Sequence, residues 1–417
     1  MLSNAIDFLL VAWPNFCFGY PFVMAWYWMA GGILFYLTRE RATVAAQDPV
    51  TESWSPISIL VPCYNEADNI EETLSAALGV DYPDFEVLAI NDGSRDETAA
   101  VLDRLAGQQP KLRVVHLAAN QGKANALNSG ALLARHELLV CIDGDALLDP
   151  QALRWVARTF RRHTIGAVTG NPRIRNRSSM LGRLQVGEFS SIIGLIRRAQ
   201  TMYGRLFTVS GVLCAFRKAA LEQSGWWSSH TLTEDIDVTW RLQLAGWRVV
   251  YEPRAIVWIL MPETLRGLWR QRLRWAQGGA QMMLDYFRPV MRLQVPGLLP
   301  TYLNFIVSIA WAYAMAIALV VSLLLATGIL SASVLPGFGL IPGGWGLTLT
   351  VTYLAQALVS HLLERRFEPT MLRALFWTIW FPLAFWMISC ATTVAGLPRA
   401  LMHPRQATWI SPDRGVR

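Results

Sequence analysis

Long uncharged stretches at both ends of the chain enclose a more polar middle part. The first stretch, residues 16–37, is about as long as a helix needs to cross a bilayer, and Arg39 and Arg41 follow it. Because basic residues mark the cytoplasmic end of a span, the middle part is predicted to be cytoplasmic. The aromatic residues of the stretch, with no basic segment before it, argue against a cleaved signal peptide. The short apolar residues 6–13 are interpreted as an interfacial segment or an extension of this span.

Three further apolar stretches, residues 302–330, 345–363 and 375–397, follow the middle part. Three spans that start inside would place the arginines of the C-terminal tail outside. This opposes the tendency of basic residues to stay inside, whereas Arg365 and Arg366 suit a cytoplasmic turn, as does Arg373. Two interpretations remain: the tail lies outside despite its charge, or one stretch is re-entrant.

The middle part repeats one pattern, an apolar run, a polar turn and then an amphipathic segment. The four repeats are PISILVPCYNEADNIEETLSAAL, FEVLAINDGSRDETAAVLDRL, LRVVHLAANQGKANALNSGALLA and ELLVCIDGDALLDPQALRWVARTF. Each reads as a strand, a loop and a helix. Strands that alternate with helices predict an α/β fold with a mostly parallel, doubly wound sheet, in which ligands bind beyond the carboxyl ends of the strands.

These patterns divide the chain into five parts. The middle part has roughly 235 residues, enough for a hydrophobic core of its own. The predicted parts are an N-terminal membrane segment (1–38), a linker (39–55), a cytoplasmic domain with interfacial helices (56–292), a C-terminal transmembrane region (293–400) and a tail (401–417).

Composition agrees with a cytoplasmic domain joined to membrane segments. The 417 residues are 53% hydrophobic and 16% charged, more apolar than a typical soluble protein but too charged to be all membrane. The net charge of +7 is spread along the chain without a long basic run, so no nucleic-acid partner is expected. The five cysteines form no CxxC pair, which predicts neither a zinc site nor a disulfide framework.

Polar turns follow the predicted strands, and their residues are the first candidates for chemistry. Asp92 begins an Asp-Gly turn that can present a carboxylate to a ligand, although most such pairs are only turns. Lys123 lies where a helix is predicted to begin and suits a phosphate contact; a merely exposed lysine is the alternative. Asp143 and Asp145 flank one glycine after a predicted strand, which suits a divalent cation that also binds a diphosphate.

Two later segments are candidates for catalysis and substrate binding. Glu234 and Asp235 begin a predicted helix. Stabilisation of the helix N-terminus by acidic residues is the alternative explanation for them. Close to the other carboxylates, such an acid suits a general base. In GLWRQRLRWAQGG, Arg272 and Arg274 suit a departing diphosphate and Trp275 suits the face of a sugar ring. Contacts to lipid headgroups are the alternative for the arginines.

The order of these motifs resembles that of the processive family 2 glycosyltransferases, which include cellulose, chitin and hyaluronan synthases. The motifs VPCYNE, NDGS, GKANALN, DGD, GNPRIR, VSG, TED and QRLRW cover nearly the whole predicted cytoplasmic domain. Longer segments resemble the bacterial poly-β-1,6-N-acetyl-D-glucosamine synthases within that family. These segments are GNPRIRNRSSMLGRLQVGEFSSIIGLIRR, WILMPETLRGLWRQRLRWAQGG and WISPDRG.

This resemblance implies a GT-A fold and an inverting enzyme that uses UDP-N-acetylglucosamine with Mg²⁺ or Mn²⁺. The product would be a β-1,6-linked biofilm polysaccharide, exported through membrane spans in the bacterial inner membrane. The implied site residues are Asn65, Glu66 and Asp92 for the uridine pocket, Asp143 and Asp145 for the diphosphate and metal, Asp235 as the base, and Gln271, Arg274 and Trp275 for the QxxRW element. Lys123 for phosphate and Glu234 for catalysis remain candidates from their positions in the sequence.

The amino-terminal part departs from relatives with two spans there, because this sequence has room for only one. A small membrane partner subunit and control by cyclic di-GMP are known in the family. The resemblance therefore implies that such a subunit completes the channel and that any cyclic di-GMP site is shared between subunits.

Three alternative functions remain: a processive synthase of another polymer such as chitin, hyaluronan or cellulose, a transferase that adds one sugar to a lipid carrier, and a non-catalytic membrane scaffold. QxxRW followed by membrane helices favours chain extension. A scaffold is expected to have lost Asp145 or Asp235, and both are present.

Overall fold

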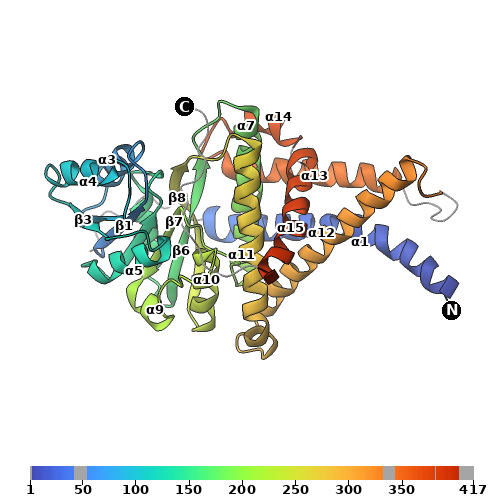
Figure 1. The fold of residues 1–417 in the computed structure, drawn as a ribbon, viewed down its shortest axis with the longest axis horizontal. Helices are drawn as coiled ribbons and strands as arrows, with labels where there is room; N and C mark the ends of the chain where they lie inside the picture. The colour runs from blue at the N-terminus through green and yellow to red at the C-terminus, as the bar shows by residue number, and fades with distance from the viewer. Residues whose placement is uncertain (1, 42–53, 332–342, 381, 403–417) are drawn as a thin grey trace.

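The structure, a computed structural model, describes residues 2–41, 54–331, 343–380 and 382–402. Figure 1 shows a sheet domain with its covering helices on one side and long helices of the two chain ends on the other. The predicted linker therefore lies largely outside the described residues, as does the WISPDRG segment of the tail.

The first four strands form the predicted parallel sheet. They are β1 (Ile57–Cys63), β2 (Phe85–Asn91), β3 (Leu112–His116) and β4 (Leu138–Ile142), paired side by side in the order β3-β2-β1-β4. The helices that follow them are α3 (Ile70–Leu78), α4 (Thr98–Ala106), α5 (Lys123–Leu133) and α6 (Ala152–Phe160). The α/β prediction is confirmed for these four units, and the polar turns share one edge of the sheet.

Four later strands extend the sheet and make it mixed. They are β5 (Leu147–Leu148), β6 (Ile165–Ile174), β7 (Leu213–Arg217) and β8 (Arg248–Ile259), which complete the order β4-β7-β6-β8-β5. Strand β7 runs antiparallel to both β4 and β6, and β6 and β8 are parallel. The antiparallel β7 brings the VSG segment before it to the edge that carries the DGD turn.

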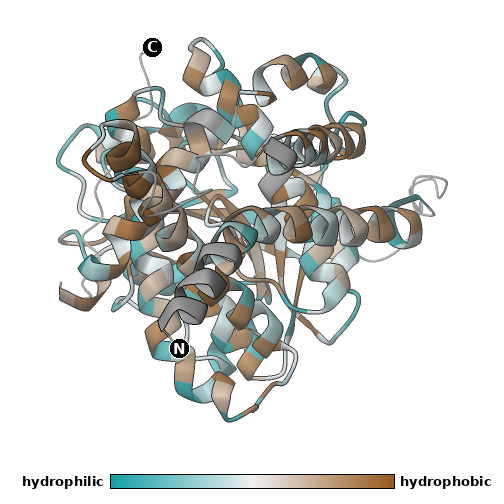
Figure 2. Cartoon of the chain, turned by 90° about the vertical axis from the view of Figure 1, so that its right-hand side faces the viewer, coloured by the Kyte–Doolittle hydropathy of each residue, from teal (hydrophilic) through white to brown (hydrophobic). Residues whose placement is uncertain are grey.

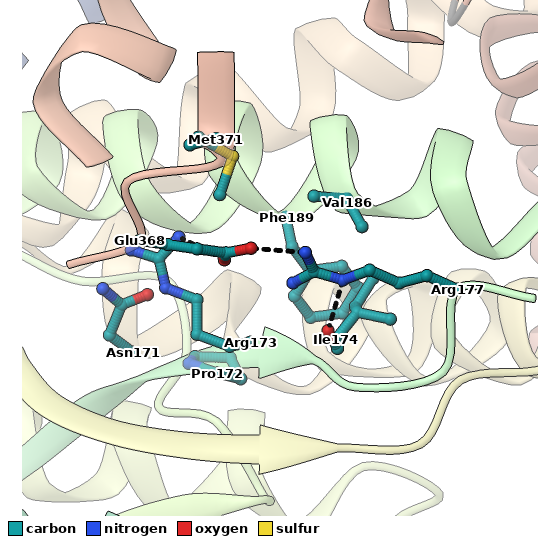
Figure 3. A pocket seen from close by; sticks show the side chains of 9 residues that line it. All are labelled: Asn171, Pro172, Arg173, Ile174, Arg177, Val186, Phe189, Glu368 and Met371. Carbon is teal, nitrogen blue, oxygen red and sulfur yellow. Dashed lines mark hydrogen bonds and ion pairs between the residues drawn. The ribbon is translucent and has the colours of Figure 1, made fainter. Parts of the chain in front are cut away.

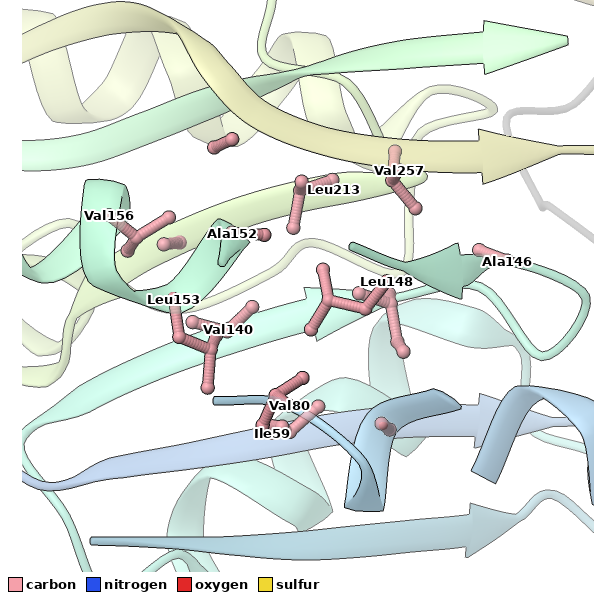
Figure 4. Close-up of a cluster of buried hydrophobic side chains, with 14 of the residues drawn as sticks. Ile59, Val80, Val140, Ala146, Leu148, Ala152, Leu153, Val156, Leu213 and Val257 are labelled. Carbon is pink, nitrogen blue, oxygen red and sulfur yellow. The ribbon is translucent and has the colours of Figure 1, made fainter. Parts of the chain in front are cut away.

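Alternate residues of the strands face two hydrophobic cores, since successive side chains point to opposite faces of a sheet. Ile59 and Val140 face helices α3, α4 and α6, where Leu153 and Val156 pack against them (Figure 4). Leu60 and its neighbours face α5, α9 (Lys218–Gln223) and α10 (Glu234–Leu244). Both faces are covered, so the ends of the strands are left to bind ligands.

A continuous helical stretch after β6 connects the sheet domain to the membrane helices. It consists of α7 (Met180–Glu188), the π-helical segment η2 (Phe189–Ile196) and α8 (Arg197–Tyr203). Helix α1 (Leu2–Phe35) approaches α8 closely, since a Cβ at Gly31 would lie 2.6 Å from the Cβ of Ala199. The glycine therefore allows two backbones to pack together at this junction.

Helical segments form the remainder. They are the long helices α11 (Leu265–Met291), α12 (Leu298–Ala326) and α13 (Gly343–Glu364), the short α14 (Met371–Thr378), the π-helical segment η3 (Pro382–Trp386) and α15 (Met387–Met402). Exposed apolar side chains lie along α12 and α13, among them Leu323, Leu347 and Val351. Figure 2 views the molecule from the side on which these helices lie in Figure 1 and shows many hydrophobic residues on the helices of that side. Such faces suit lipid rather than water.

Three helices in the described part of the chain are long and apolar enough to cross a membrane, Ala12–Glu40, Leu298–Ala326 and Trp345–Glu364. Residues 6–13 continue into the first of them within α1, which fits the expected extension of that span. The stretch 375–397 differs from expectation, because it is divided among α14, η3 and α15. Pro382 lies at this division, where proline offers no backbone donor to continue a helix.

A buried ionic cluster joins the sheet domain to two membrane helices. The guanidinium of Arg198 on α8 donates to Glu40 at the end of the first span, at 2.6 Å, and also to Glu364 at the end of α13. Arg173 at the end of β6 pairs with the same carboxylate of Glu364. All four side chains are buried, so each charge depends on its partners.

Candidate active site

The turns after β1 and β2 are tied together at the carboxyl edge of the sheet. Asn65 adopts a positive φ of 54°. Its backbone N–H donates to the Ser94 hydroxyl at 3.0 Å, and its side-chain oxygen accepts from the Arg95 N–H at 2.9 Å. The Glu66 N–H donates to the Thr98 hydroxyl at 2.9 Å. The sheet edge thus holds the two turns predicted for the uridine pocket as one unit.

Asp92 fixes the loop that leads into α5. Its side chain is fully buried, and its two carboxylate oxygens accept from the backbone N–H groups of Gln121 and Gly122, each at 2.8 Å. Burial raises the pKa of Asp92, although the two N–H groups oppose this shift. The geometry gives Asp92 a positioning role toward Lys123, which follows Gly122; its predicted contact to uridine stays a prediction.

Lys123 joins the DGD turn to the start of α10. Its ammonium lies 2.5 Å from a carboxylate oxygen of Asp143 and 3.6 Å from one of Glu234. It also donates to the Gly211 carbonyl at 3.2 Å. Burial alone would lower the pKa of Lys123, but the charges of Asp143 and Glu234 outweigh burial and raise it. The structure thus brings together three predicted site residues from three separate elements.

Gly211 of the VSG segment lies where these charges converge with Asp235. A Cβ placed on Gly211 would be 3.2 Å from the Lys123 nitrogen, 3.6 Å from a carboxylate oxygen of Asp235 and 4.0 Å from one of Glu234. Burial and the neighbouring Glu234 raise the pKa of Asp235 to about 6, while Lys123 and Arg274 oppose the shift. A carboxylate with this pKa is suited to accept a proton near neutral pH.

The DGD turn is suited to a cation. Asp145 is buried beside Asp143, and a Cβ on the glycine between them would lie 3.1 Å from Cγ of Glu66. Among the described residues, no three or more His, Cys, Asp or Glu side chains gather as a complete metal site. The Lys123 ammonium against Asp143 shows that a positive charge is accommodated here. Two carboxylates therefore fit a divalent ion whose other ligands come from a bound phosphate group.

Helix α11 presents the QxxRW element to this centre. Arg274 is exposed, and its charge acts on Asp235. Trp275 keeps 37% of its surface exposed, so the face of its ring can contact a ligand. The side-chain oxygen of Gln271 is buried and lacks a hydrogen-bond partner within the described residues. A polar group of this kind is available to a ligand.

Arg272 is part of the protein interior, which corrects its expected role in binding diphosphate or headgroups. It donates to Glu188 at 2.6 Å, and the side chains of Arg272 and Glu188 are only 10% and 3% exposed. Its guanidinium lies 4.4 Å from the centre of the Trp275 ring. Arg272 therefore connects α11 to α7 and supports the tryptophan.

Two glycines fix the position of α11 next to the catalytic carboxylates. A Cβ on Gly278 would lie 2.4 Å from Cγ2 of Thr233, the residue before Glu234, and a Cβ on Gly279 would lie 2.8 Å from Phe305 on α12. The GG pair in RWAQGG thus lets the helix that carries Arg274 pack directly against the start of α10.

Replacing Gly278 by Ala is expected to lower turnover by about tenfold or more, because the new methyl group displaces Thr233 and with it Asp235. Turnover per folded protein is the measurement. Gly107→Ala is the matched control, since a Cβ there makes only ordinary contacts of 3.6 Å or more. Equal turnover of the two variants would show that the close packing at Gly278 does not position the site.

Arg197, a buried arginine on α8, was not predicted from the sequence as a site residue. Its guanidinium donates to the Thr169 hydroxyl at 3.1 Å, which also accepts from the Ser210 N–H at 2.8 Å. Burial lowers the pKa of Arg197 to about 10, and the charges of Tyr251 and Asp235 oppose this shift. Its apolar surroundings in SIIGLIRR resemble a membrane segment, so only the fold reveals that it faces the site.

Comparisons with known proteins agree across both parts of the chain. Residues 55–278 match the family described as glycosyltransferase like family 2. The chain is 38% identical over 409 residues to the poly-β-1,6-N-acetyl-D-glucosamine synthase of Staphylococcus epidermidis, an alignment that covers 96% of this chain and 98% of that protein. The synthase of that name from Staphylococcus aureus MSSA476 is also 38% identical, over 411 residues, with the same coverage.

A solved structure shows the same fold. It is a mannosyltransferase from Pyrobaculum calidifontis in complex with GDP-Man and Mn²⁺, with a TM-score of 0.63 and 21% sequence identity. The superposition covers 95% of this chain and 99% of the other. Shared architecture therefore extends through the sheet domain and the C-terminal helices.

Proposed function

This chain belongs to the family 2 glycosyltransferases, and on that basis we propose that it polymerises N-acetylglucosamine from UDP-N-acetylglucosamine into a β-1,6-linked polysaccharide and helps to export it. The observation that carries the proposal is identity of 38% over nearly the whole chain to synthases of this polymer. The region of identity includes the membrane helices as well as the sheet domain. This favours a polymer synthase, because a transferase of one sugar needs no exit path for a polymer.

Product analysis tests this function. Membranes that contain the protein are given labelled UDP-N-acetylglucosamine, and the linkage of the product is determined by methylation analysis. A long β-1,6-linked product is expected. A single labelled sugar on a lipid would replace this proposal by the lipid-carrier alternative, and incorporation of glucose or glucuronic acid would replace it by another processive synthase.

The proposed reaction is one inversion at the anomeric carbon. Asp235 accepts the proton of the 6-hydroxyl of the terminal sugar while that oxygen attacks C1 of the donor. The bond from C1 to the diphosphate breaks, UDP leaves with the electron pair, and the α-linked donor becomes a β-linked product. Lys123 and Arg274 offset the negative charge on the departing UDP. Burial of Asp235 and the neighbouring charge of Glu234 raise the pKa of Asp235, and this increases the basicity that the step requires.

Substrate positions follow from the residues around this centre. Asn65, Glu66 and Asp92 are proposed to form the uridine side, Gln271 the acceptor side, and Trp275 a stacking surface for the terminal sugar. Asp143 and Asp145 would hold Mg²⁺ or Mn²⁺ together with the diphosphate. The ion supplies positive charge to the leaving group.

Asp145→Asn is expected to reduce turnover by about a hundredfold and chelation of divalent ions to abolish it, because the ion would lose a charged ligand. UDP release with and without chelator is the measurement. Asp149→Asn, which removes a carboxylate that caps the next helix by accepting from the Gln151 N–H at 3.0 Å, is the control and should keep its turnover. Full turnover in excess chelator would exclude a metal-dependent reaction.

Topology and partners belong to the same proposal. With three spans, α1 enters the cytoplasm, α12 leaves it and α13 returns, so α14 and the arginines of the tail stay inside. The segment η3 and helix α15 then pack against the middle of α12 without crossing the membrane. This favours the interpretation in which residues 375–397 do not cross the membrane. We place the protein in the bacterial inner membrane, with a small partner subunit completing the channel and any cyclic di-GMP bound between subunits.

A further inference from the structure

An arginine-lined cavity of about 180 Å³ lies between the sheet domain and α14, and none of its lining residues belongs to the candidate active site. Arg177 follows β6, Arg183 comes from α7 and Arg373 comes from α14. Trp377 completes one wall. Three separate elements thus direct cations to one place.

The positive charge of this cavity is only partly neutralised. Arg177 pairs with Glu368, as Figure 3 shows, and its Nε donates to the Ile174 carbonyl at 2.9 Å. Its remaining nitrogen, Nη2, is buried without a hydrogen-bond partner within the ranges that the structure covers. A buried donor of this kind costs free energy unless a ligand satisfies it.

Arg183 and Arg373 form no ion pair with a carboxylate in the described part of the chain. The Nε of Arg183 donates to the Arg177 carbonyl at 3.1 Å, and its guanidinium lies 5.3 Å from the centre of the Trp377 ring. Glu263, a carboxylate near the start of α7, accepts from Ser178 and Ser179 instead. The cavity is therefore suited to an anion, and guanidinium groups match the oxygens of a phosphate.

The surroundings of the cavity indicate which phosphate it receives. Helix α14 begins seven residues after Glu364, the end of the third candidate span. Its outer side chains are apolar and exposed, with Phe376 at 62% and Trp380, just beyond the helix, at 46%. A short helix with such a face beside arginines is typical of a segment that lies at the headgroup level of a bilayer.

We propose that this cavity binds the phosphate of an anionic phospholipid from the cytoplasmic leaflet. The phosphate oxygens accept hydrogen bonds from Nη2 of Arg177 and from the guanidinium groups of Arg183 and Arg373. The acyl chains lie along the exposed face of α14 near Phe376. The lipid then connects a loop of the sheet domain to a helix of the membrane part, a role separate from glycosyl transfer.

The test uses the full chain in nanodiscs of dioleoylphosphatidylcholine with or without dioleoylphosphatidylglycerol. Phosphatidylglycerol retained by the protein after mild detergent release is counted by native mass spectrometry. Arg183→Gln/Arg373→Gln is expected to weaken retention roughly 30-fold, the loss of two headgroup contacts. Both side chains are exposed, so the variant is expected to fold.

A matched variant removes the same charge elsewhere at the membrane boundary. Arg288 and Arg292 are exposed at the end of α11, just before α12, and line neither described cavity. Arg288→Gln/Arg292→Gln is expected to retain phosphatidylglycerol as the unchanged protein does. Equal losses in the two double variants would show only general attraction to anionic headgroups and would overturn the proposal. Displacement of the lipid by millimolar inorganic phosphate would assign the cavity to a soluble phosphate and would equally overturn it.

Discussion

Replacing Asp235 by Asn is expected to lower turnover by roughly two to four orders of magnitude while donor binding stays within a few-fold, because only the general base is lost. The amide keeps an oxygen that can accept from the Ile236 N–H, a contact of 2.9 Å. The start of α10 therefore stays intact. UDP release and the binding of UDP-N-acetylglucosamine are measured on the same preparation.

The control for this variant is Asp237→Asn, two residues farther into the same helix. Asp237 pairs with Arg241 at 2.6 Å and accepts from the Tyr286 hydroxyl at 2.8 Å. Its loss should affect stability more than turnover. If donor binding by Asp235→Asn falls as much as turnover, Asp235 is a structural cap rather than a base.

The pH profile of the unchanged enzyme is a second test of Asp235 as the general base. Since the base form of Asp235 is required, activity should rise with pH through about 6 and fall below it. The charges that face this carboxyl are Glu234 on its own helix, Lys123 on α5, Arg274 on α11 and Arg197 on α8. Glu234→Gln leaves the burial of Asp235 in place but removes the neighbouring negative charge that also raises its pKa, so the acidic limb should shift to lower pH.

Arg274→Ala is expected to reduce polymer synthesis by roughly three orders of magnitude, the upper end of losses seen when one stabilising donor is removed from a leaving group or oxyanion. Arg274 is exposed, and its charge acts on the centre that contains Asp235. Membrane insertion and thermal unfolding should therefore be unchanged. Polymer yield and UDP release are measured from equal amounts of inserted protein.

The neighbouring Arg272 provides the contrast. Arg272→Ala leaves the Glu188 carboxylate buried without its partner, which costs about 3–5 kcal/mol. This variant should lose folded protein, whereas Arg274→Ala should lose only activity.

Trp275→Ala should impair chain extension more than hydrolysis of the donor, because stacking serves the acceptor. Comparable polymer from Arg274→Ala and the unchanged protein would return this arginine to the headgroup interpretation.

The strand ends were predictable because local sequence determines them. A buried parallel strand needs a continuous apolar run, and the polar residues that follow, such as Asp92, Asp143 and Asp145, are left at one edge by the topology alone. The spacing of Arg274 and Trp275 on one helix is equally local.

Pairs distant in the sequence were not predictable. Arg272 and Glu188 are separated by 84 residues. The QxxRW spacing singles out Arg274, but nothing near Arg272 indicates that it pairs with a buried carboxylate. The division of residues 375–397 into separate helical segments was not predictable either. The length and hydropathy of an apolar stretch do not show where its helix breaks or that part of it packs on α11. Arg197 was missed for the same reason, since a buried guanidinium is recognised only from the groups that surround it.

The ionic cluster of Arg198, Arg173, Glu40 and Glu364 imposes an order of biosynthesis. Arg198 emerges from the ribosome 166 residues before Glu364, and a guanidinium pair left without that carboxylate cannot be buried at low cost. The contact between α8 and α13 is therefore expected to form only after Glu364, at the end of the third candidate span, has been translated.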